Sequence, residues 1–127
     1  MTNFEKVKEF YNTFNQISEP TRVVTPSPEK ISLRLKLIRE ELEEINQELN
    51  KDKIDHQKLA KEIADLLYVA YGFGSAFGYP MDEVFAEVHA SNMSKLGPDG
   101  KPIYREDGKI IKGPNYRVAD LSSIVKE

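Results

Sequence analysis

Apolar residues recur at helical spacing in four successive stretches of the 127-residue chain, and each stretch predicts an amphipathic helix. The predicted helices span residues 3–17, 28–50, 56–77 and about 82–96. Polar residues mark where three of them begin. Ser27 followed by Pro28 offers a helix cap with proline in the first helical position.

Two aspartates supply the other start signals. Asp55 can cap the third helix, and Asp82, just after Pro80, lies near the start of the fourth. Between these two aspartates, Gly72, Gly74 and Gly78 fall within or at the end of an apolar helical pattern. They lack the lysine and hydroxyl residue of a phosphate-binding loop, so we interpret them as close packing sites and a helix stop.

The pattern changes after the fourth helix. Two short apolar segments, Ile103-Tyr104 and Ile110-Ile111, lie among two Asp-Gly pairs. This pattern predicts a β-hairpin that turns at Glu106-Asp107-Gly108. The sequence therefore predicts an all-α protein with a short C-terminal hairpin.

The length indicates one domain. A chain of 127 residues is long enough to bury one core but too short for two independent ones. We expect a single domain over residues 1–127, with a helical core at about 3–96 and a hairpin tail at 97–127.

The second predicted helix combines a core stripe with many glutamates. Its stripe consists of Ile31, Leu35, Ile38, Leu42, Ile45 and Leu49. At about 100° per residue, Glu40 falls nearly opposite the stripe and Glu43 on one flank. Glu41 and Glu44 fall on the other flank, beside Leu37, so this pair is expected to border a buried surface.

The third predicted helix carries a carboxylate within its apolar face. That face is formed by Leu59, Ile63, Leu66, Ala70, Phe73 and Phe77. Glu62 lies about 40° from Leu66 on the helical wheel, with Asp65 at the edge of the face. Because an unpaired buried carboxylate costs several kcal/mol, Glu62 should have a cation, a strong donor or a metal as its partner.

Two interpretations of these acidic residues remain open on spacing alone. They could form solvated ion pairs, Glu40 with Lys36 or Arg39, and Glu62 with Lys58 or Lys61. Alternatively, two neighbouring helices that each offer an i,i+3 carboxylate pair can coordinate a divalent metal. The chain has no cysteine, which favours hard cations such as Mg²⁺ or Mn²⁺.

Composition narrows the classes of partner. The net charge of −3 argues against broad nucleic-acid binding, and no apolar run approaches the roughly 20 residues of a membrane span. The N-terminal segment lacks the pattern of a secretion signal, so we expect a cytoplasmic protein. Near the end of the fourth helix, Asn92 and Lys95 lie at helical spacing and could meet phosphate or a nucleobase, although a polar helix end would look the same.

The acidic pattern also resembles a known family. The pattern is E41-x-x-E44, then seventeen residues, then E62-x-x-D65, and it lies within the segments LIREELEE and KEIADLLYV. It resembles the signature of the MazG-like all-α nucleoside triphosphate pyrophosphohydrolases. Dimeric dUTPases and phosphoribosyl-ATP pyrophosphohydrolases belong to the same superfamily. The resemblance covers about residues 30–96 and implies a four-helix bundle.

The resemblance implies an activity and roles for named residues. The family reaction hydrolyses a nucleoside triphosphate between the α and β phosphates, giving a monophosphate and pyrophosphate. Glu41, Glu44, Glu62 and Asp65 would bind Mg²⁺, or Mn²⁺ in its place, and Glu41 would accept the proton of the attacking water. Asn92 and Lys95 would contact the substrate, with Arg34, Arg39 and Lys61 as further candidates.

The resemblance also implies that several copies of the chain assemble. Family members form dimers or tetramers, and Leu33 and Leu37, which lie outside the core stripe, fit such an interface. We therefore expect a homodimer or homotetramer.

Two functions other than hydrolysis stay open: a non-catalytic helical assembly module and a nucleotide sensor. The base, the sugar and the preference for triphosphate over diphosphate do not follow from the sequence.

Overall fold

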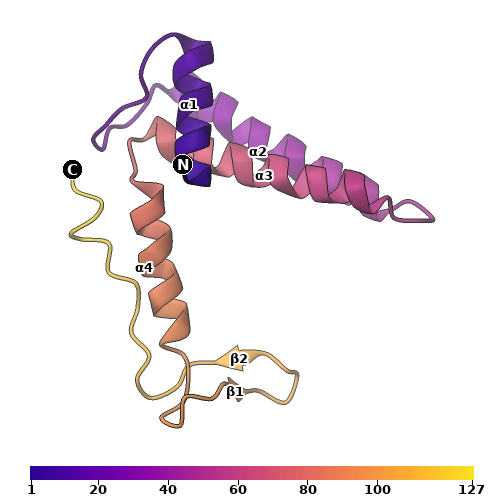
Figure 1. The fold of residues 1–127 in the computed structure, drawn as a ribbon, viewed down its shortest axis with the longest axis vertical. Coiled ribbons are helices and arrows are strands. Elements are labelled where there is room, and N and C mark those ends of the chain that lie inside the picture. Colours follow the sequence, from indigo (N-terminus) through magenta and orange to yellow (C-terminus); the bar gives the residue numbers. More distant parts are fainter. The chain divides into compact units, whose positions relative to one another are not determined.

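The computed structural model describes residues 1–127, and it contains the four expected helices and the hairpin (Figure 1). The helices are α1 (Asn3–Asn15), α2 (Pro28–Leu49), α3 (His56–Ala76) and α4 (Met81–Met93). The strands are β1 (Ile103–Tyr104) and β2 (Ile110–Ile111). The fold class predicted from the sequence, all-α with a short C-terminal hairpin, is confirmed.

The helix starts follow the expected signals. The side chains of Ser27 and Asp55 accept hydrogen bonds from the backbone N–H groups three residues later, at distances of 3.2 Å each. Thr2 and Glu5 form a reciprocal capping box at the start of α1. This helix ends two residues earlier than predicted, at Asn15, because Gln16 adopts a left-handed conformation with φ 57°.

Residues 1–81 form one compact unit, to which Glu127 also belongs. Within it, α2 and α3 lie antiparallel and side by side, and α1 packs against α3 (Figure 1). The buried apolar core is small and consists of Phe4, Val7 and Tyr11 of α1 with Ala76 of α3. The core thus lies where α1 meets the C-terminal half of α3.

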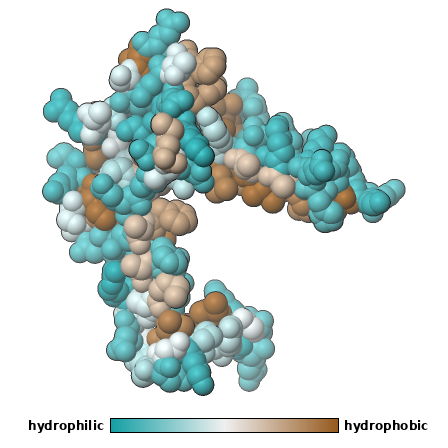
Figure 2. Space-filling model, viewed as in Figure 1, coloured by the Kyte–Doolittle hydropathy of each residue, from teal (hydrophilic) through white to brown (hydrophobic).

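The expected core stripes of α2 and α3 are only partly buried. Leu42 is 57% exposed, Leu49 50% and Ile63 46%, so the prediction that these residues lie in the core is wrong for the first unit. Each of these two helices covers only one side of the other, and α1 covers only part of α3. Apolar side chains therefore remain along the α2–α3 arm, where Figure 2 shows them as a brown edge.

The glycines of α3 have the predicted packing and stop functions. A Cβ at Gly72 would lie 2.6 Å from the Tyr11 hydroxyl, so only glycine lets α1 approach α3 this closely. Gly78 has φ 73° and directly follows the helix cap, which fits a helix stop.

Residues 82–126 form a second compact unit. It contains nearly all of α4, the hairpin and the C-terminal segment. The strands are antiparallel, with Ile103 opposite Ile111 and Tyr104 opposite Ile110. The turn lies where predicted, since the N–H of Gly108 donates to the carbonyl of Arg105 at 2.9 Å.

Candidate metal centre

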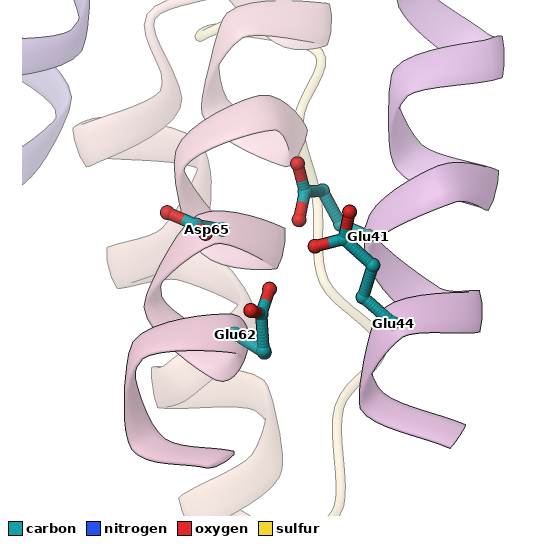
Figure 3. Close-up of side chains that lie close together, drawn as sticks. All are labelled: Glu41, Glu44, Glu62 and Asp65. Atoms are coloured by element: carbon teal, nitrogen blue, oxygen red, sulfur yellow. The ribbon is translucent and has the colours of Figure 1, made fainter. Parts of the chain in front are cut away.

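Four carboxylates from two helices meet between α2 and α3. Glu41 and Glu44 come from α2, and Glu62 and Asp65 come from α3 (Figure 3). One oxygen of each residue can be chosen so that all four atoms lie within 4.8 Å of one another. The i,i+3 spacing puts each pair on the helix face that looks toward the other helix. The structure therefore brings together all four residues that the sequence suggested as metal ligands.

Two oxygens of this cluster are buried and have no partner. Oε2 of Glu41 and Oε2 of Glu62 are inaccessible to solvent and accept no hydrogen bond. Glu62 as a whole is only 5% exposed. An unsatisfied buried carboxylate oxygen is costly, and a bound cation would remove that cost at both atoms.

The protonation of the cluster reflects its crowding. The neighbouring Glu44 carboxylate, with which Glu62 can share a proton, raises the pKa of Glu62, and burial raises it further. Lys61 acts in the opposite direction. Its Nζ lies 2.7 Å from Asp65 and 4.0 Å from Glu62, and the bond to Asp65 raises the pKa of Lys61. One ammonium therefore faces four carboxylates, which leaves an excess of negative charge.

The donor set fits a hard divalent cation. Carboxylate oxygens are the ligands that Mg²⁺ and Mn²⁺ prefer, and the cluster contains neither sulfur nor imidazole. Such an ion would give the unpartnered oxygens of Glu41 and Glu62 a partner, and it would counteract the effect of the neighbouring Glu44 carboxylate, which raises the pKa of Glu62.

The other glutamates of α2 are bound elsewhere or solvated. Glu40 is exposed and lies 3.9 Å from Lys36, as the ion-pair interpretation expected. Glu48 is buried, but Lys51 and Lys58 neutralise it at 2.7 Å and 3.3 Å. The ion-pair interpretation therefore holds for these two glutamates. For Glu62 the expected pair with Lys61 is present at 4.0 Å, but it leaves Oε2 of Glu62, like Oε2 of Glu41, without a partner.

Arg34 lies in a buried network two helical turns from Glu41. It donates to Oε1 of Glu19 at 3.0 Å and to the carbonyl of Gly72 at 2.6 Å, and its guanidinium lies 3.8 Å from the centre of the Tyr11 ring. Arg34 and Glu19 also line a pocket of about 460 Å³ together with Leu33 and Leu37 of α2. The side chain thus has a structural partner and also borders a cavity.

The remaining predicted substrate residues differ in their surroundings. Arg39 is exposed on α2 and forms no ion pair. Asn92 is exposed near the end of α4, and Lys95 is half-buried just after it. Asn92 and Lys95 belong to the second unit, whereas the carboxylates belong to the first. Substrate contact by these residues stays a prediction.

Sequence reasoning missed Glu19. This residue is 3% exposed and accepts hydrogen bonds from Arg34 and from Ser75 at 3.2 Å. It lies in a loop, outside any periodic pattern, and its partners are 15 and 56 residues away. The one available signal was Arg34, whose charge falls beside the core stripe of α2.

Comparison with known proteins adds a family. The protein family described as "Phosphoribosyl-ATP pyrophosphohydrolase" matches residues 7–92 of this chain, and these residues include all four carboxylates. The chain belongs to this family. It is thereby a member of the MazG-like all-α NTP pyrophosphatase superfamily, as the resemblance suggested. The phosphoribosyl-ATP pyrophosphohydrolase family consists of pyrophosphohydrolases, which supports a hydrolase at this general level.

One curated relative is similar over most of the chain. Uncharacterized protein L479 of Acanthamoeba polyphaga mimivirus is 27% identical over 114 residues, which is 87% of this chain. The chain spans 42% of the length of that relative. None of the four helices combines the length and apolarity needed to cross a membrane.

Proposed function

We propose that the protein hydrolyses a nucleoside triphosphate between its α and β phosphates, with Mg²⁺ as the cofactor. The observation that carries this proposal is the cluster of Glu41, Glu44, Glu62 and Asp65, with two buried oxygens that have no partner. Membership of a pyrophosphohydrolase family supports the type of reaction. The products are a nucleoside monophosphate and pyrophosphate.

The carboxylates share one task in this reaction, and Glu41 has a second. All four would hold the cofactor, which would neutralise phosphate charge and acidify a water molecule. Glu41 accepts the proton when the water oxygen bonds to phosphorus and the P–O bond between the α and β phosphates breaks. Its Oε2 accepts no other hydrogen bond, which leaves it available as the general base.

Cationic and neutral side chains complete the proposed site. Lys61, already beside Asp65 and Glu62, can move to a phosphate oxygen once a metal neutralises these carboxylates. Arg34 borders the pocket of about 460 Å³ on the same face of α2 as Glu41, and this pocket can receive the nucleoside part. Asn92 and Lys95, and less directly Arg39, remain candidates for phosphate or base contacts.

We further propose that the protein assembles as a homodimer or homotetramer. Leu33 and Leu42 of α2 and Leu67 of α3 are 58%, 57% and 55% exposed. Leu33 and Leu42 lie nine residues apart and therefore on opposite sides of α2, and apolar side chains this exposed are typical of surfaces that other subunits cover.

A substrate panel tests the function. The protein is incubated with Mg²⁺ and with NTPs, dNTPs, modified nucleotides or phosphoribosyl-ATP, and released pyrophosphate is measured. We expect at least one substrate to be hydrolysed to its monophosphate. Glu62→Gln should lower the rate by at least about 100-fold.

Glu43→Gln is the matched control, because Glu43 is an exposed glutamate of α2, between Glu41 and Glu44 of the cluster, and forms no ion pair. It should retain activity. Nucleotide binding without turnover in the wild-type protein would instead support the sensor function. Absence of both binding and turnover would leave the assembly module.

A further inference from the structure

The second unit contains a cationic hollow beside the hairpin. Four basic residues and two isoleucines line it, and its volume is about 330 Å³. The lining residues are Lys95, Arg105, Lys109, Ile110, Ile111 and Lys112. Such a concentration of positive charge is unexpected in a protein with a net charge of −3.

Backbone contacts hold the cationic hollow together. The N–H of Gly113 donates to the carbonyl of Lys95 at 2.8 Å, which fixes the end of the hairpin against the residues that follow α4. A Cβ at Gly113 would lie 2.5 Å from the carbonyl oxygen of Leu96, so only glycine permits this approach. The contact places Lys112, the neighbour of Gly113, beside Lys95.

Across the hairpin, the N–H of Arg105 donates to the carbonyl of Lys109 at 2.8 Å. Opposite residues of an antiparallel pair carry their side chains on the same face. The pairing therefore places these two cations together, and with Lys112 and with Lys95, which follows α4, they line one cavity.

Most of this charge has no carboxylate partner. Arg105 is paired with Asp107, and the Nζ of Lys112 lies 4.7 Å from the centre of the Tyr116 ring. No acidic group lies within 4.0 Å of the ammonium groups of Lys95, Lys109 or Lys112. Three like charges around one cavity repel each other, and an anion with several negative oxygens would relieve that repulsion.

We propose that the cationic hollow binds an oligophosphate. This ligand is either the phosphate chain of a nucleotide or released pyrophosphate. Lysine ammonium groups bind phosphate oxygens as point charges, and several of them around one cavity match a ligand with several phosphates. Exposed Ile110 and Ile111 give the cavity an apolar wall, and Figure 2 shows apolar side chains among hydrophilic ones on the hairpin. The choice of these anions rests on the proposed function.

Binding of inorganic pyrophosphate to the full-length protein tests the proposal. Isothermal titration calorimetry is done at low salt with EDTA, so that the carboxylate cluster cannot hold phosphate through a metal. We expect saturable binding that weakens as salt is raised. The double variant Lys109→Gln/Lys112→Gln should raise Kd at least about tenfold, because two charge-assisted contacts are lost.

The control is the double variant Lys101→Gln/Lys126→Gln, which removes the same two charges from exposed lysines of the same tail outside the cavity. It should leave Kd within about twofold of the wild-type value. A titration with ATP under the same conditions distinguishes the two possible ligands, a nucleotide and released pyrophosphate. Tighter binding of ATP than of pyrophosphate identifies the nucleotide, and equal binding identifies the released product.

Three results would overturn the proposal. They are no binding of pyrophosphate or ATP, equal weakening by the double variant and the control, and tighter binding of a single-stranded oligonucleotide than of either phosphate. Glu62→Gln separates this proposal from the proposed function. This variant should lose hydrolysis with Mg²⁺ and still bind pyrophosphate in EDTA, so one idea can fail without the other.

Discussion

The buried ion pair between Arg34 and Glu19 should be a main determinant of stability in the first unit. Their side chains are 5% and 1% exposed, and the charged atoms lie 3.0 Å apart. Removing one member of a buried pair leaves the other charge without compensation, at a cost of about 3–5 kcal/mol. Arg34→Met also removes the donor to the carbonyl of Gly72 and the contact with Tyr11.

The expected result for Arg34→Met is a loss of about 3–5 kcal/mol in the free energy of unfolding and a fall in Tm of about 10–20 °C. Glu19→Gln should be similarly destabilising, because it leaves the buried guanidinium of Arg34 without a carboxylate. In Arg34→Met, Lys30 does not replace the lost cation, because it lies 3.9 Å from Glu19 and is 38% exposed. The double variant should cost much less than the sum of the two, because it leaves no unpaired buried charge. Urea unfolding followed by far-UV circular dichroism measures all four proteins.

Two results would refute this reasoning. The first is a loss below about 1 kcal/mol for each single variant, which is typical of a solvated surface pair. The second is strict additivity in the double variant, which would mean that the two side chains contribute independently.

Two further predictions concern the carboxylate cluster and the exposed arm. Without metal, the raised pKa of Glu62 gives stability that is fully present below the ordinary glutamate pKa and is lost as pH rises through the raised value. The wild-type protein should therefore become less stable relative to Glu62→Gln as the pH rises above the ordinary glutamate pKa, and a constant difference in urea unfolding would contradict this. Leu42→Glu, at a 57% exposed leucine, should convert the oligomer to a monomer in light scattering, and an unchanged mass would exclude this surface from the interface.

The sequence predicted the elements and the carboxylate cluster well because both depend on local spacing. Ser27 and Asp55 cap their helices through contacts only three residues long. Glu41 and Glu62 were separated from the solvated glutamates by their angle around the helix, and the structure confirms that both have a buried oxygen without a partner.

What the sequence did not reveal depends on distant contacts. Glu19 is buried by residues of α2 and α3 that no periodic pattern connects to it. Leu42 and Ile63 have the spacing of core residues, yet within the first unit no third helix covers them. Periodicity identifies the face of a helix that avoids water, but not whether the same chain or another subunit covers it.

Titration with Mn²⁺ followed by electron paramagnetic resonance tests the central claim most directly, because it counts the ions that the cluster holds. We expect wild-type protein and Glu43→Gln to bind Mn²⁺ with equal affinity, and Mg²⁺ to displace it. Glu62→Gln should lose this binding while its circular dichroism stays unchanged. Equal binding by all three proteins, or none by the wild type, would contradict the assignment of Glu41, Glu44, Glu62 and Asp65 as a metal centre.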